Sequence, residues 1–151
     1  MEKCQGIGRL GPEKMSPLVC VGIIAGLMMS ATSTLACPIK PTNTRMIVNG
    51  KTHTLAFTTT PKPVQVGKTF SVSLEICDDN DKAFFGTIKT STTMPLHKHG
   101  MNYLPSVEVF GKGKFKLDGF LFHMPGHWQF VFDLRGTDKP DRITIKHMLQ
   151  Q

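Results

Sequence analysis

Histidine and methionine gather in two short segments of this 151-residue chain. The first segment, residues 94–101, reads M-P-L-H-K-H-G-M, and the second, residues 122–128, reads F-H-M-P-G-H-W. Imidazole nitrogen and thioether sulfur both bind metals; soft sulfur favours Cu(I), whereas imidazole accepts Cu(II), zinc or nickel. We therefore expect a metal site, with copper as the first choice and zinc as the second.

The spacing within each segment indicates how its ligands would be presented. In an extended chain, His97 and His99 project to the same side. In the second segment, Pro125 and Gly126 fit a type II turn, so the histidines on either side would flank a hairpin end. The candidate ligands are Met94, His97, His99, Met101, His123, Met124 and His127. The two isolated histidines, His53 and His147, are expected not to be ligands.

Other interpretations of the two segments stay open. A blue-copper centre requires a cysteine beside two histidines, and neither segment contains one. A zinc site made of four histidines remains an alternative, as does a pair of loops with surface histidines and packing methionines. The chain has no G-x-S-x-G elbow, phosphate-binding loop or H-E-x-x-H motif, so we expect a binding protein and not an enzyme.

Alternating apolar and polar residues predict the strands that position these segments. An Asn-Gly pair at 49–50 predicts a hairpin between residues 45–48 and 52–57. In residues 115–121 the alternation turns Phe115, Leu117 and Leu121 inward, and the same parity could turn His123 inward as an ordinary core histidine. The strand candidates are residues 45–48, 52–57, 70–76, 84–92, 115–121, 128–134 and 143–145. Frequent Gly and Pro turns between them predict an antiparallel β-sandwich of about seven strands.

The N-terminus has the pattern of a secretory signal peptide helix, residues 1–36. Residues 18–29 are uncharged, basic residues precede them, and small residues follow as far as Ala36. Twelve residues are few for a membrane-spanning helix, although an uncleaved anchor stays an alternative. We expect the protein to be exported to the periplasm or cell envelope, with a flexible leader at 37–44 and one domain at 45–149.

Cleavage after Ala36 would leave Cys37 as the first residue, where lipidation is one alternative. In an oxidising compartment Cys37 can instead pair with Cys77. Membrane attachment is therefore expected only through an uncleaved signal or a lipidated Cys37. Residues 37–151 hold 15 Lys and Arg against nine Asp and Glu, but an exported protein meets no genome, so we expect no nucleic-acid partner.

The two segments carry a family resemblance. M-P-x-H-x-H-G-M at 94–101 and G-F-L-F-H-M-P-G-x-W at 119–128, with P-x-x-V-G-K-x-F at 63–70, resemble the YtkA-like domain family over residues 55–149. The resemblance implies a small exported immunoglobulin-like β-sandwich that handles copper or helps to mature an envelope redox or copper protein. It carries over Met94, His97, His99, Met101, His123 and Met124, whereas His127 departs from the family pattern. The alternative is a metal-free interaction module in the cell envelope.

Overall fold

The computed structural model describes Cys37, residues 39–136 and residues 139–150. These residues contain nine β-strands. All of these residues belong to one compact unit, Ser33–Gln151. The predicted signal peptide helix lies outside the described residues. The strands are β1 Met46–Asn49, β2 His53–Thr60, β3 Thr69–Asp78, β4 Gly86–Met94, β5 His99–Gly100, β6 Ser106–Gly111, β7 Lys114–Leu121, β8 Gly126–Gly136 and β9 Asp141–Leu149.

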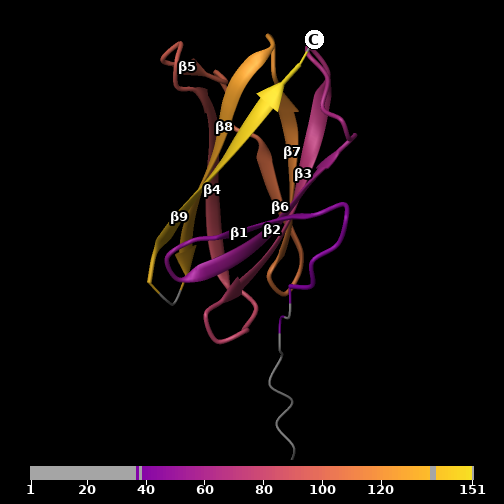
Figure 1. Ribbon diagram of the computed structural model, residues 1–151. Coiled ribbons are helices and arrows are strands. Elements are labelled where there is room, and N and C mark those ends of the chain that lie inside the picture. The colour runs from indigo at the N-terminus through magenta and orange to yellow at the C-terminus, as the bar shows by residue number, and fades with distance from the viewer. Residues whose placement is uncertain (1–36, 38, 137–138, 151) are drawn as a thin grey trace, which may run out of the picture. The chain divides into compact units, whose positions relative to one another are not determined.

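The strands make two antiparallel sheets packed face to face (Figure 1). One sheet has the order β1-β2-β3-β7-β6 and the other has the order β5-β4-β8-β9. The predicted antiparallel β-sandwich is confirmed, with nine strands where about seven were expected. The sequence did not predict β5 and β6, because β5 has only two residues and β6 is largely exposed and lacks the alternation of a half-buried strand.

An aromatic core fills the space between the sheets. β3 buries every second side chain from Phe70 to Ile76, as its alternation predicted. β8 does the same from Trp128 to Leu134. The ring of Phe57 on β2 packs edge-on against Phe130 on β8 with centroids 5.1 Å apart, which joins the layers. Fully burying one such side chain stabilises the fold by roughly 1.5–3 kcal/mol.

The predicted parity of β7 is wrong beyond Leu117. Phe115 and Leu117 are buried as expected, but the next inward residue is Phe120, not Leu121. The register against β3 slips by one residue at this point, and Gly119 has a φ of +96°. An extra residue in one strand reverses the parity of everything after it. The bulge therefore turns Phe122 into the core and His123 out to the surface.

The predicted hairpin at Asn49-Gly50 is confirmed: β1 pairs with β2 in antiparallel register. Asn-Gly hairpin turns usually require a positive φ at the glycine, but Gly50 does not have one. A β-carbon at this position would instead overlap the carboxylate of Asp141 and lie 2.8 Å from Ile143. Close packing of β9 against this loop thus excludes a side chain at residue 50.

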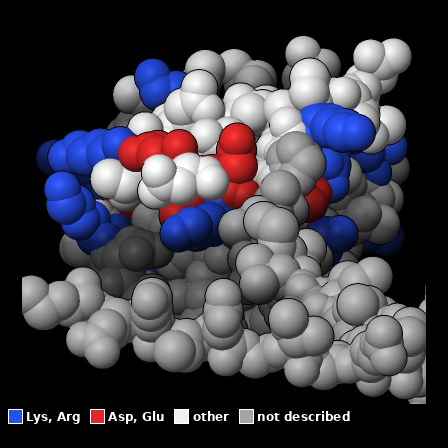
Figure 2. Space-filling model, turned by 90° about the horizontal axis from the view of Figure 1, so that it is seen from below, with Lys and Arg blue, Asp and Glu red and all other residues white. Residues whose placement is uncertain are grey.

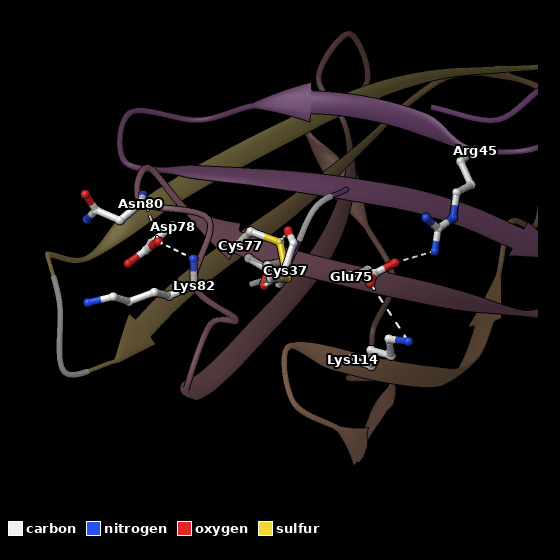
Figure 3. The surroundings of a disulfide bond; sticks show 9 residues. Cys37, Arg45, Glu75, Cys77, Asp78, Asn80, Lys82 and Lys114 are labelled. Atoms are coloured by element: carbon white, nitrogen blue, oxygen red, sulfur yellow. Dashed lines mark hydrogen bonds and ion pairs between the residues drawn. A yellow bond between two sulfur atoms is a disulfide. The ribbon is translucent and has the colours of Figure 1, made fainter. Parts of the chain in front are cut away.

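One end of the sandwich, the disulfide end, is closed by a bond between Cys37 and Cys77 (Figure 3). Their α-carbons lie 5.8 Å apart, which lies in the usual range for a disulfide. The pairing of these cysteines, one of the alternatives that the sequence left open, is present, and it fixes residue 37, where the leader was expected to begin, to the end of β3. Nearby, the carboxylate of Glu75 forms an ion pair with Arg45, and its Oε1 lies 3.9 Å from the Nζ of Lys114.

Candidate metal-binding site

The opposite end of the sandwich carries the β4–β5 hairpin, which presents His97 and His99 (Figure 1). The backbone N–H of His97 donates to the carbonyl oxygen of Met94 over 3.0 Å. Lys98 follows with a left-handed φ of 55°. The predicted extended stretch through both histidines is wrong, because the chain reverses here. His97 lies in the turn, and His99 opens the returning strand.

A connection between the two sheets, residues 122–125, presents His123. β7 belongs to the five-stranded sheet and β8 to the four-stranded sheet, so the hairpin predicted between them is wrong. The chain instead crosses from one layer to the other. Gly126 has a positive φ of 127°, and the indole N–H of Trp128 donates to the carbonyl oxygen of Met124 over 3.0 Å. This bond holds the connection against the core.

The two segments meet in a row of three imidazoles, the histidine row, made of His97, His99 and His123. The ring centroid of His99 lies 5.7 Å from that of His97 and 5.3 Å from that of His123. Trp128 contacts two members of the row edge-to-face, with centroids 6.4 Å from His99 and 5.4 Å from His123. The three histidines are exposed, whereas Trp128 is buried. The three exposed imidazoles therefore lie over the buried indole of Trp128.

The three methionines of the two segments lie on the core side of the row. Met94 is the directly opposed partner of His99 in the β4–β5 register, and opposed residues of an antiparallel pair project from the same face. Met94 is fully buried, while Met101 and Met124 are partly buried and pack against the core. Met94 thus shares the face of His99, and Met101 follows β5 two residues after His99.

The structure does not bring His127 to the histidine row. Side chains alternate between the faces of a strand, and the neighbouring Trp128 points into the core. His127 is exposed, and its register partner on β9 is the exposed Met148. We therefore place His127 on the outer face of the four-stranded sheet, away from the other candidate ligands.

The remaining histidines also lie away from the row. His53 is buried at the disulfide end, with its Nδ1 3.6 Å from the Oδ2 of Asp141. His147 is partly buried, and its ring centroid lies 6.0 Å from that of Phe122. Burial lowers the pKa of His147 and so favours the neutral imidazole. The described ring contacts of both histidines are with phenylalanines and not with the histidine row, and their role as non-ligands stays a prediction.

The charge around the row differs from that at the disulfide end. Residues 93–105 and 122–128 contain Lys98 and no carboxylate, whereas Asp, Glu, Lys and Arg side chains mix on the described surface of the disulfide end (Figure 2). In the described ranges no group of three or more His, Cys, Asp or Glu side chains could hold a metal ion. A metal at the row would thus require a thioether as a third protein ligand or a small movement of the exposed rings.

The sequence did not predict that Trp128 contacts the histidine row. The alternation of residues 128–134 assigned Trp128 to the core alone, but its ring also contacts two histidines. The available signal was its place within the second His–Met segment.

No protein-family model, curated protein or solved structure matches this chain. Over the residues that the structure describes, no helix has the length and apolar character needed to cross a membrane.

Proposed function

We propose that this chain is an exported copper-binding protein that holds the ion at the histidine row, either to sequester it or to deliver it to a partner in the cell envelope. The observation that carries the proposal is the position of His99, whose ring lies 5.7 Å from that of His97 and 5.3 Å from that of His123. Two loops distant in sequence thereby present donors to one volume of space.

These spacings suit shared coordination. An imidazole nitrogen binds a metal at about 2 Å, which puts the centroids of two rings on one metal roughly 5 to 6 Å apart. Both neighbouring pairs in the row have centroid distances in this range. His99 belongs to both pairs, so it is the ligand that any two-histidine site in the row would share.

The methionines favour copper over zinc. Thioether sulfur is a soft ligand that selects Cu(I), and zinc sites seldom use it. Met94 shares the face of His99 through their register, and Met101 follows β5 two residues after His99. Met101 is the more accessible of the two, because Met94 is fully buried in the core. We therefore assign His99, one of its two neighbours His97 and His123, and Met101 as the main ligands. Coordination by all three histidines would require the exposed rings to move. Met94 and Met124 pack behind them.

The disulfide supports export. Bonds such as Cys37–Cys77 persist in oxidising compartments and are rare in the cytosol. A paired Cys37 has no free thiol for lipidation, which favours a soluble envelope protein among the alternatives. The YtkA-like resemblance points in the same direction and is part of this proposal.

The test is a titration of the purified protein with Cu(I) and Cu(II), each alone. Trp128 is the only tryptophan of the chain and contacts two row histidines, so bound Cu(II) should quench its fluorescence. Cu(I) affinity is measured by competition with a chromophoric chelator. A His97→Ala/His99→Ala variant should lose both signals. The matched control is His127→Ala, which removes an exposed imidazole from the outer face and should bind like the wild type.

Equal copper uptake by the double variant and the wild type would remove the row from the site. Loss of binding in the His127→Ala control, with the row intact, would place the ion on the outer face instead. Circular dichroism of each variant confirms that the sandwich is retained.

An interaction module that binds no metal is the second candidate, and β6 favours it. This strand lies at the edge of its sheet and exposes Val107, Val109 and Phe110. An exposed apolar edge can accept a partner strand. In that case an envelope partner should co-purify with the His97→Ala/His99→Ala variant and be lost with Val109→Lys.

A further inference from the structure

A groove at the side of the sandwich contains no residue of the histidine row. It lies between β2 and the end of β9, with residues 62–66 along one side, and it encloses about 810 Å³. Pockets that bind small molecules usually measure 300–1,000 Å³. The groove therefore has the size of a ligand site.

The residues that line the groove are mainly apolar, and they range from buried to about half exposed. Phe57, Val64 and Leu149 are buried and form the floor. Met46 and Met148 are about half exposed, at 48% and 53%, and form the rim. Methionine side chains are flexible and polarisable, so they adapt to apolar ligands of different shape. The groove thus offers a rigid apolar base under an adaptable rim.

Two of the polar side chains that line the groove, His147 and Lys62, can donate hydrogen bonds to a ligand. His147 lines it, and no hydrogen bond of the described residues engages its imidazole. A neutral imidazole keeps one N–H donor. Lys62 also lines it and donates to the carbonyl oxygen of Thr44 over 3.4 Å, with no ion pair to a described carboxylate.

No aspartate or glutamate is among the lining residues. A ligand that pairs with an ammonium group and an imidazole N–H, and that covers an apolar floor, must have an anionic or strongly accepting head and an apolar tail. A carboxylate meets the first requirement, because it accepts several hydrogen bonds and pairs with lysine.

We propose that this groove binds a single-chain amphipathic carboxylate, such as a medium-chain fatty acid. The tail lies over Phe57, Val64 and Leu149, and the head group takes hydrogen bonds from Lys62 and His147. This binding is independent of copper, because none of the groove residues belongs to the histidine row.

The probe is dansylamino-undecanoic acid, added to the purified protein and displaced by dodecanoate. Its dansyl group should accept energy from Trp128, whose register partner on β9 is His147, which reports binding near the groove. Dodecanoate should displace the probe, while dodecyltrimethylammonium of equal chain length should not. Lys62→Gln should weaken dodecanoate about two- to fivefold, the range of an exposed ion pair. Lys68→Gln, at an exposed lysine outside the groove, should change it less than twofold.

A matched pair at the rim tests the location without disturbing the core. Met148→Glu adds a carboxylate to the groove and should weaken dodecanoate at least tenfold, whereas Met148→Gln should stay within threefold of the wild type. The His97→Ala/His99→Ala variant should bind dodecanoate normally. Absence of probe binding, equal displacement by the anionic and cationic amphiphiles, or identical affinities in the Met148 pair would each overturn the proposal.

Discussion

The imidazole rings of His99 and His123 lie 5.3 Å apart, although 24 positions separate these residues in the sequence. The first residue opens β5 and the second lies on the crossing between the two sheets. The buried ring of Trp128 contacts both. Contact with one buried ring thus connects both histidines to the packed end of the sandwich, which distinguishes them from two independent surface loops.

This geometry predicts unequal effects of single substitutions in the histidine row. His99→Ala should weaken Cu(I) binding at least tenfold more than His97→Ala, because His99 is the neighbour of both other rings; tenfold corresponds to about 1.4 kcal/mol. Chelator competition on the single variants measures this ranking. Equal losses in the two variants would contradict the central position of His99, and a matched His127→Ala variant reports any general effect of removing an imidazole.

The fold class followed from the sequence because a half-buried strand repeats every two residues. Phe70–Ile76 and Trp128–Leu134 alternate without interruption, and both are buried as predicted. The predicted alternation failed in Phe115–Leu121, because Gly119 is an extra residue in the pairing of β7 with β3. A glycine inside a strand pattern is a known signal of a bulge, so this reversal of parity was open to prediction.

The candidate site was predictable in composition but not in arrangement. Clustering in sequence identified His97, His99 and His123, which the structure brings together. His127 is excluded by its alternation with the inward-facing Trp128. The crossing that presents His123 depended instead on which strands pair, since β7 and β8 lie in different sheets. A proline–glycine turn suits a hairpin and an inter-sheet crossing alike, so local residues do not distinguish them.

The disulfide predicts a large loss of stability on reduction. Cys37 and Cys77 enclose a separation of 40 residues, and closing a loop of that length in the unfolded chain is worth about 4 kcal/mol. The Cys37→Ala/Cys77→Ala variant should therefore unfold at a markedly lower urea concentration than the oxidised protein. Reduced wild type serves as the control and should match the variant. Unchanged midpoints in all three samples would show that the bond does not stabilise the fold.

Asp141 predicts a pH-dependent anchor for the β1–β2 loop. Its carboxylate accepts from the backbone N–H groups of Thr52 at 2.9 Å, His53 at 3.2 Å and Arg142 at 2.8 Å. Burial acts to raise the pKa of Asp141, but the backbone donors outweigh it and the pKa is lowered. The stabilisation is therefore present above about pH 4 and is lost as the pH falls through the lowered pKa.

Replacing this residue should remove both the stability and its pH dependence. Asp141→Ala leaves buried backbone donors without an acceptor and should cost about 2–4 kcal/mol in the free energy of unfolding at pH 7. Urea unfolding at pH 7 and pH 3 measures the two effects. The control is Asp79→Ala, at an exposed turn residue, and an equally small change in both variants would argue against the anchor.

His147 predicts a loss of stability on mild acidification. Its ring lies 6.0 Å from the rings of Phe122 and Phe130, and burial there lowers the pKa of the imidazole in the folded state. The unfolded chain binds this proton first, near pH 6.5, as the pH falls. The contribution of His147 is therefore complete above pH 6.5 and declines as the pH falls through the lower folded pKa. His147→Gln cannot take up this proton, so its free energy of unfolding should decrease less between pH 7.5 and pH 5.5 than that of the wild type. The exposed His127→Gln variant should follow the wild type over the same range, and if His147→Gln did so too, the acid sensitivity would have to arise elsewhere.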